Sequence, residues 1–155
     1  MEPRWRALDP GALPRLADDE VQLHLVPIAF ANPWRDALLA HALACAPAAL
    51  RYSREAHGRP YLEAGGAPAF NLAHTDDWAL FALAHGTPVG VDLEAPRAVA
   101  RREALLARFF RESERRAIAA GADPERLLLH AWAGKEAMVK AIGRGIAYGL
   151  ARVEL

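Results

Sequence analysis

The chain has 155 residues, 53% of them apolar and 25% charged, and its formal net charge is zero. This length suits one domain, or two intimate half-domains, with a sizeable core. The neutral charge argues against a nucleic-acid partner. No apolar run reaches membrane-spanning length, and the start MEPRWRALDP is not typical of a signal peptide. Because the single Cys45 cannot form an internal disulfide, we expect a cytoplasmic protein.

The first part of the chain predicts a small sheet with one helix. Residues 1–20 are rich in proline and then in acidic residues, which indicates a loose lead-in. The stretch Val21–Ile28 alternates as a strand does, and Trp34–Cys45 is an alanine- and leucine-rich helix stopped by Pro47. After a glycine- and proline-rich stretch, Phe70–His74 and Trp78–Ala84 predict a hairpin turning at residues 75–77.

The character of the sequence changes near residue 87. The stretch Val89–Glu94 predicts one more strand, which ends at Pro96. Three helices are expected next, at Ala98–Phe110, Glu112–Ala120 and Pro124–Ile142, followed by a short strand at Ala151–Leu155. The predicted class is α+β, with half-domains at 21–86 and 87–155 in one compact unit.

Two carboxylates stand close together in the stretch VGVDLE. If it is a strand, Val89, Val91 and Leu93 point to the core, and Asp92 and Glu94 share the opposite face, with Cα atoms roughly 6.5 to 7 Å apart. Side chains so placed suit one hard cation such as Mg²⁺. The alternative is a solvated acidic face.

A third carboxylate, Glu136, lies in the stretch AWAGKEAMVKAIGRG, which also holds the only two lysines, Lys135 and Lys140. On a helix, Glu136 and Lys140 are one turn apart, so the plainest interpretation is a surface ion pair. The functional interpretation places Glu136 opposite Asp92 and Glu94, with the two lysines reaching phosphate oxygens. In the first half, Arg59 and His74 are candidate phosphate donors from loop positions.

Five motifs occur in one order: GRPYL, FNLAHTDDWALFALA, GVDLE, RFFRESE and WAGKEAMVKAIGRG. Together they resemble the 4′-phosphopantetheinyl transferase superfamily, in particular its larger single-chain type, which includes the surfactin-synthetase activator. The resemblance runs from about Leu38 to Gly145, and the combination of motifs is specific.

This resemblance implies roles for individual residues. It implies magnesium ligands at Asp92, Glu94 and Glu136, and a catalytic contact from Lys140 to the coenzyme A pyrophosphate. It also implies that Glu114 is the base toward the acceptor serine. The remaining coenzyme A contacts that it implies are Arg59, His74, Thr75 and Lys135.

The implied protein is a Mg-dependent holo-carrier-protein synthase. A serine of an acyl or peptidyl carrier protein attacks the β-phosphorus of coenzyme A, the co-substrate, and adenosine 3′,5′-bisphosphate leaves. The implied fold is a pseudo-duplicate of two half-domains, each with a small antiparallel sheet and helices, here with a second half shortened at its C-terminus. We expect a monomer, or an oligomer if the second sheet is completed in trans.

Two other hypotheses remain open. One is a non-catalytic coenzyme A or nucleotide-binding protein of this fold, because Ala73 stands where the family often has serine. The other is a structural domain in which the carboxylates only form salt bridges with Lys135 and Lys140.

Overall fold

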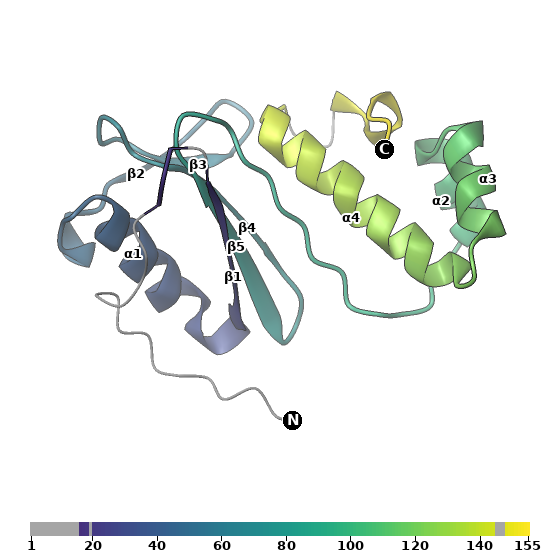
Figure 1. Ribbon diagram of the computed structural model, residues 1–155, viewed down its shortest axis with the longest axis horizontal. Coiled ribbons are helices and arrows are strands. Elements are labelled where there is room, and N and C mark those ends of the chain that lie inside the picture. The colour runs from purple at the N-terminus through teal and green to yellow at the C-terminus, as the bar shows by residue number, and fades with distance from the viewer. Residues whose placement is uncertain (1–15, 19, 145–147) are drawn as a thin grey trace.

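The first half of the chain is built around a three-stranded antiparallel sheet. The structure, a computed structural model, describes residues 16–18, 20–144 and 148–155. The sheet has the order β1-β5-β4 and consists of β1 (Val21–Pro27), β4 (Ala69–His74) and β5 (Trp78–Ala84). Helix α1 (Ala31–Ala42) covers one face of it (Figure 1). These elements confirm the predicted strands and hairpin. Most of the predicted lead-in, residues 1–20, lies outside the described residues.

The hairpin between β4 and β5 turns where the sequence predicts. Thr75 donates its backbone N–H to the carbonyl oxygen of Trp78 at 2.8 Å, and its hydroxyl accepts from the N–H of Trp78 at 3.2 Å. A second pair, β2 (Tyr52–Arg54) and β3 (Pro60–Leu62), was not predicted, because each strand has only three residues and lies among turn residues.

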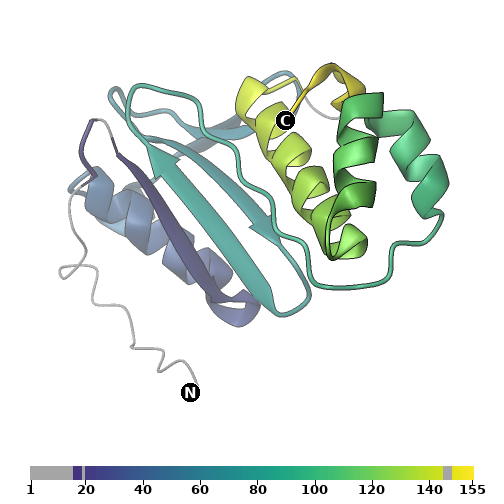
Figure 2. The ribbon, with the colours of Figure 1, turned by 45° about the vertical axis from the view of Figure 1, so that its right-hand side comes forward.

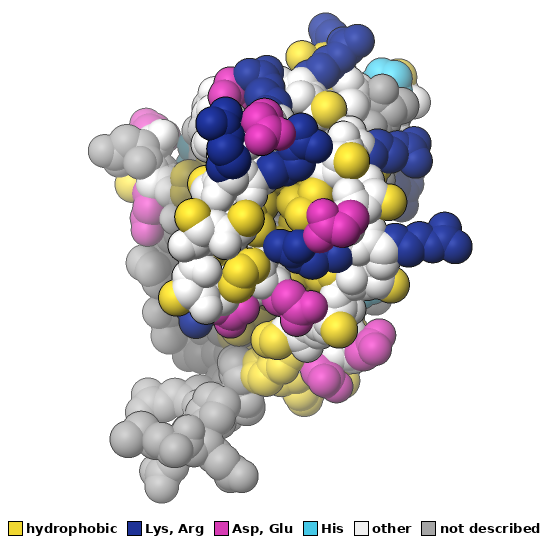
Figure 3. All heavy atoms as spheres, turned by 90° about the vertical axis from the view of Figure 1, so that its right-hand side faces the viewer, with side chains coloured by type: hydrophobic (Ala, Val, Ile, Leu, Met, Phe, Trp, Pro, Cys, Tyr) yellow, Lys and Arg dark blue, Asp and Glu magenta, His cyan; other side chains and the backbone are white. Residues whose placement is uncertain are grey.

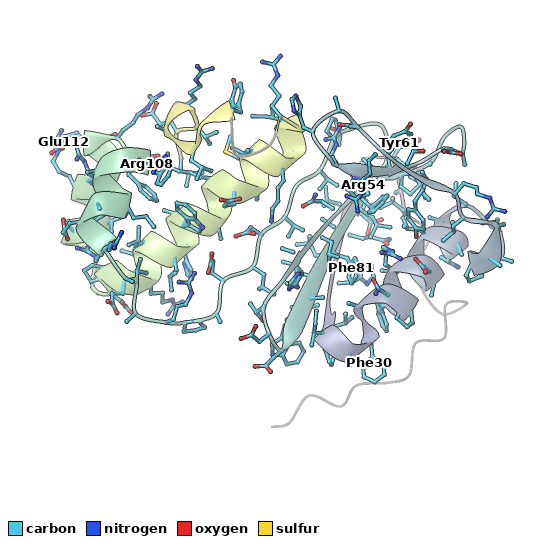
Figure 4. All side chains as sticks on the ribbon, turned by 180° about the vertical axis from the view of Figure 1, so that it is seen from behind. Phe30, Arg54, Tyr61, Phe81, Arg108 and Glu112 are labelled. Carbon is cyan, nitrogen blue, oxygen red and sulfur yellow. The ribbon has the colours of Figure 1, made fainter. Side chains whose placement is uncertain are left out.

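An apolar core lies between α1 and the sheet. Phe81 is 1% exposed and packs in one cluster with Leu38 and Leu39 of α1 and Val26 of β1. Figure 4 shows Phe81 in the middle of the sheet, beside α1, and Phe30 at the end of the helix. The period-2 pattern of the strands and the apolar face of α1 account for this layer.

The connection from β5 to the second half is extended but is not a strand. Residues 88–95 have no regular secondary structure, so the predicted strand Val89–Glu94 is wrong. The expected alternation is nevertheless right, because Val89, Val91 and Leu93 pack with Ala73 and Ala82 of the sheet. Figures 1 and 2 show the connection running between β4 and α4. At Val91, the backbone N–H donates to Asn71 of β4 and the carbonyl oxygen accepts from Lys140 of α4. These bonds to side chains take the place of backbone pairing with another strand.

The second half is helical. It contains α2 (Arg102–Phe109), α3 (Glu112–Ala120) and α4 (Pro124–Ile142), followed by a 3-10 turn, η5 (Leu150–Arg152). The predicted bounds of α3 and α4 are confirmed, whereas the first helix begins at Arg102 and not at Ala98. Asp123 caps α4 by accepting from the N–H of Arg126, and Gly143 ends it with a φ of 75°.

Among residues 87–144 and 148–155 there is no strand, so the predicted strand Ala151–Leu155 is wrong. The segment instead curls onto α4, because the carbonyl oxygens of Leu150 and Val153 accept hydrogen bonds from Lys135. The α+β class is therefore confirmed for the molecule, but the expectation of a small sheet in each half fails for the described part of the second half. The pseudo-duplication and the shortening remain predictions.

The second half has its own core and a charged outer face. Leu106, Phe110, Ile118 and Leu128 form the centre of its apolar cluster. Figure 3 shows lysine and arginine side chains gathered over much of the outer face, interspersed with carboxylates. Arg108 and Glu112 lie at this end of the molecule, far from the sheet (Figure 4). Within the described residues, none of the helices has the length and apolar character that a membrane span requires.

Candidate functional site

Asp92 and Lys140 meet where the connection crosses α4. The Nζ atom of Lys140 lies 2.5 Å from Oδ1 of Asp92 and 3.1 Å from the carbonyl oxygen of Val91. The side chain of Asp92 is 12% exposed and that of Lys140 is 29% exposed, so the pair lies in a partly open position. The last turn of α4 and the extended connection therefore hold this ion pair between the two halves.

Glu136 lies one turn before Lys140 on α4 and is 8% exposed. Burial raises the pKa of its carboxyl group, and so do the carboxylates of Asp92 and Glu94, while the ammonium of Lys140 lowers it. The net pKa lies above its usual value, since carboxylates that share one site disfavour each other's charge. The structure thus brings Asp92, Glu94 and Glu136 within electrostatic reach of one another and of Lys140.

Glu94 lines a pocket and is bound by Arg97, whose Nη2 lies 2.7 Å from its Oε2. The pocket, about 450 Å³ in volume, lies between the connection and the first turns of α4. Asp92 and Glu94 line it, together with Leu129, His130 and others. The candidate site therefore opens into a space that can admit part of a ligand.

The fit of these residues to a magnesium ion rests on their chemistry. No three His, Cys, Asp or Glu side chains of the described chain are gathered closely enough to hold a metal as they stand. The set consists of carboxylates, the donors that Mg²⁺ prefers, and the side chain of Glu136 forms no hydrogen bond or ion pair with other described residues. A buried carboxylate with a raised pKa is a group that a dication would stabilise in its charged form. The donor set fits the ion, although two of its members are bound by Lys140 and Arg97.

Arg59 reaches the same end of α4 from the first half. It donates through Nη1 to the carbonyl oxygen of Ala141 at 2.9 Å and through Nη2 to Oε1 of Glu55 at 2.6 Å. Its guanidinium also lies against Gly143, at the end of the helix. Ala141 follows Lys140 directly in the last turn of α4. Arg59, which comes from the first half, therefore contacts the same end of the helix that carries Lys140.

His74 ends β4, and Thr75 follows it in the hairpin turn. His74 is exposed, and its Nδ1 lies 3.4 Å from the carbonyl oxygen of Thr75. Thr75 bonds with Trp78 to close the turn. The imidazole is therefore accessible to a ligand, while the hydroxyl of Thr75 already serves the hairpin.

Lys135 has a structural position and not one at a phosphate site. It is 0% exposed, and its Nζ lies 2.9 Å from Oε1 of Glu114, donates to the carbonyl oxygens of Leu150 and Val153, and lies over the ring of Phe110. A side chain buried in this way has no surface with which to bind coenzyme A. The geometry therefore does not support the predicted phosphate contact of Lys135.

Glu114 is the partner of Lys135 and is 8% exposed. Its Oε1 also accepts from the N–H of Leu155 at 3.1 Å, and its Oε2 accepts from the N–H of Arg111 at 2.8 Å. Burial would raise the pKa of this carboxyl group, but the bonds from Lys135, Arg111 and Leu155 outweigh burial and hold the pKa below its usual value. A carboxylate bound at both oxygens and with a lowered pKa is a poor base, so the predicted role toward serine is not supported either.

Two residues that position the site were missed by the sequence analysis. Asn71 is buried on β4, and its Oδ1 accepts from the N–H of Val91 at 3.0 Å, which fixes the connection beside the sheet. Gly90 lies against α4, where a methyl group would overlap the carbonyl oxygen of Ala137 and the amide nitrogen of Ala141. Asn71 stands in the motif FNLAHTDDWALFALA and Gly90 in GVDLE, so the motifs contain both residues but do not indicate how they pack.

Comparison with known proteins places these features in a family. Residues 88–155 match the model of the family described as the 4′-phosphopantetheinyl transferase superfamily. This match includes the three carboxylates and Lys140. The second half of the chain therefore matches the 4′-phosphopantetheinyl transferase superfamily, which is the resemblance that the motifs indicated.

Relatives extend the similarity beyond this half. The chain is 33% identical over 101 residues to 4′-phosphopantetheinyl transferase psf-1 of Bacillus pumilus, covering 64% of this chain and 42% of that protein. It is 34% identical over 106 residues to 4′-phosphopantetheinyl transferase HetI of Nostoc sp., covering 65% and 45% respectively. It is also 33% identical over 114 residues to the L-aminoadipate-semialdehyde dehydrogenase-phosphopantetheinyl transferase of Xenopus laevis, covering 65% and 38%. The chain spans about half, or less, of the length of the curated relatives it matches.

Proposed function

We propose that this protein transfers the 4′-phosphopantetheine arm of coenzyme A to a serine of an acyl or peptidyl carrier protein. The observation that carries the proposal is the junction of the connection and α4, where Lys140 bonds to Asp92 and where Glu94 and Glu136 lie within electrostatic reach. This junction lies inside the residues that match the superfamily. Carboxylates beside a compact ammonium suit a magnesium pyrophosphate.

Within this proposal, Asp92, Glu94 and Glu136 hold magnesium, which when bound would neutralise the pyrophosphate and the charge that develops on it. Lys140 contacts the pyrophosphate, and Arg59 and His74 bind the phosphates at the nucleotide end. Arg59 keeps N–H donors beyond those given to Glu55 and Ala141, and His74 is exposed. Thr75 shapes the turn that presents His74.

The reaction forms a bond between the serine Oγ and the β-phosphorus, breaks the bond from that phosphorus to adenosine 3′,5′-bisphosphate, and releases the proton of the serine hydroxyl to water. The residues named above contribute mainly position and charge, which is where the barrier of phosphoryl transfer is lowered. Glu114 and Lys135 take no part in the step, because they are buried and bound to each other. Their part is to fasten the C-terminal segment to α3 and α4. The cytoplasmic location, the state of association and the pseudo-duplicated architecture stay predictions.

The test is a transfer assay with an apo carrier protein, coenzyme A and Mg²⁺, followed by intact mass measurement. We expect the carrier protein to gain the mass of one phosphopantetheine group. Binding of coenzyme A without transfer would favour the non-catalytic hypothesis. Asp92→Ala should abolish transfer, since the pyrophosphate would lose its cation, whereas Arg116→Lys on the outer face should not change it. Full transfer by the Asp92→Ala protein would contradict the proposal.

A further inference from the structure

Two of the three carboxylates in the candidate metal site are already bound by cations of the protein itself. Lys140 contacts Asp92 at 2.5 Å, and Arg97 contacts Glu94 at 2.7 Å. Glu136, the most buried of the three, forms no such pair with described residues. Within the described residues, the acidic side chains are not gathered closely enough to hold a metal ion as they stand.

The bond between Lys140 and Asp92 is more than a surface ion pair. The ammonium is also held by the carbonyl oxygen of Val91, so it has two acceptors on the connection. It lies close enough to Glu136 to lower the pKa of that group, against the effects of burial, Asp92 and Glu94. The positive charge of Lys140 thus offsets part of the repulsion among the partly buried carboxylates of Asp92, Glu94 and Glu136.

An ammonium and a dication cannot share Asp92 without cost. Mg²⁺ must approach its carboxylate ligands closely, at roughly 2.0–2.1 Å, and two cations on one carboxylate repel each other. Lys140 has a flexible four-carbon stem, and its side chain is 29% exposed, so it can leave Asp92 for another anion nearby. A pyrophosphate is such an anion, and its negative charges are stabilised by nearby cations.

We propose that Lys140 is the resident counter-ion of Asp92 in the ligand-free protein and couples metal binding to coenzyme A binding. A metal alone must displace Lys140 into solvent, whereas metal and pyrophosphate together give the ammonium a new partner. The metal therefore binds weakly without coenzyme A, and each ligand raises the affinity for the other. This inference rests on the proposed function, which supplies both ligands.

The test measures the affinity of the protein for Mn²⁺ by paramagnetic resonance, with and without saturating coenzyme A and with no carrier protein present. In the unaltered protein, coenzyme A should tighten Mn²⁺ binding by about tenfold. Lys140→Met should bind Mn²⁺ about tenfold more tightly than the unaltered protein in the absence of coenzyme A, and should lose most of the coupling. Lys140→Gln, checked with Lys140→Met for unchanged circular dichroism, serves as a second variant with the same expectation.

Arg126→Met is the matched control. Arg126 lines the same pocket and is exposed, so this change also removes one positive charge from the site, without touching Asp92. Its affinity for Mn²⁺ should stay within about twofold of the unaltered protein, because an exposed charge is screened by solvent. The difference between the two variants separates contact with Asp92 from a general loss of positive charge.

The possible outcomes distinguish this inference from the proposed function. If coenzyme A tightens Mn²⁺ binding but Lys140→Met binds Mn²⁺ no more tightly than the unaltered protein or Arg126→Met, the counter-ion role is wrong and the transferase proposal stands. If none of the proteins binds Mn²⁺ even with coenzyme A, the metal assignment fails and the inference fails with it.

Discussion

The two halves of the molecule are stabilised by different kinds of contact. In the first half, α1 and the sheet enclose an apolar core in which Leu39 and Phe81 are almost completely buried. In the second half, a buried ion pair between Lys135 and Glu114 fastens the C-terminal segment to α3 and α4. Apolar contacts hold α1 against the sheet but tolerate small changes in side-chain shape and position. A buried ion pair requires its two charged groups to stay in contact, because either one alone would be a buried, uncompensated charge. The second half, which carries the candidate metal ligands, is therefore the half that depends on a buried ion pair.

The largest expected effect comes from breaking the ion pair of the second half. Lys135→Ala should lower the free energy of unfolding by about 3–5 kcal/mol, because Glu114 would remain as a buried, unpaired carboxylate. Urea denaturation measures this loss. The double change Lys135→Met with Glu114→Leu should recover part of it, since no buried charge then remains.

A matched change in the first half sharpens the contrast. Phe81→Ala should cost a similar amount, about 3–5 kcal/mol, but through a cavity that no change of charge can repair. A loss below about 1 kcal/mol for Lys135→Ala, or no recovery of stability in the double variant Lys135→Met with Glu114→Leu, would show that the ion pair is not what holds the second half.

The next effect comes from separating the halves at Gly90. Gly90→Ala places a methyl group against the backbone of α4 at Ala137 and Ala141, so the connection or the helix must shift. We expect a loss of about 1–3 kcal/mol, measured by thermal unfolding. Gly65→Ala is the control, since a methyl group there meets no atom within 4 Å, and it should be neutral or slightly stabilising. A neutral Gly90→Ala would mean that α4 does not approach the connection this closely in solution.

A smaller loss is expected from the bond that ties the connection to the sheet. Asn71→Leu removes the acceptor of the Val91 N–H, which would be left buried without a partner, at a cost of about 1–3 kcal/mol. Hydrogen exchange offers a local readout, because the Val91 amide should exchange faster while amides of the central strand β5 keep their protection. Unchanged protection of Val91 would count against the bond.

The smallest effect is the contribution of Glu114 to acid stability. Its pKa is lower in the folded protein than its ordinary value of 4.5, so its stabilising effect is present above pH 4.5 and is lost as the pH falls through the folded pKa. Glu114→Gln lowers stability at every pH, because Lys135 stays buried without its partner, but the pH-dependent part is small: the fall of stability below pH 4.5 should become flatter, with an unchanged slope above that pH. Urea denaturation at several pH values between 3 and 6 measures the slope of the free energy of unfolding against pH. If this slope is the same in Glu114→Gln as in the unaltered protein, the assignment to Glu114 is wrong.

Much of the fold follows from local pattern. The bounds of α3 and α4 were predictable because Asp123, Pro124 and Gly143 mark helix ends that need no tertiary contact. The alternation of Val89–Glu94 was predictable too, but not the lack of a partner strand, since pairing depends on what lies beside the segment. The curl of residues 150–155 onto α4 depends on Lys135, which is distant along the sequence.

The site was predictable in part for a geometric reason. Lys135 and Lys140 are five residues apart, which is about 140° around a helix of 3.6 residues per turn, so they point to different sides. Glu136 and Lys140 are one turn apart and share the side that faces Asp92. The spacing alone therefore indicates that only one of the two lysines can lie on the side that faces Asp92. Which one lies there depends on the orientation of α4, and that is set by tertiary packing.

The connection that runs between the sheet and α4 also bears on how the molecule can be divided into fragments. A fragment ending at Gly86 would leave Ala73 and Ala82 bare to solvent, because Val89, Val91 and Leu93 cover them. A fragment ending at Pro96 would keep this cover and the bond from Val91 to Asn71. Expression of the first half alone, or its use as one partner in a split-protein assay, therefore calls for a boundary at Pro96 and not at Gly86, and the complementary fragment would then begin shortly before α2.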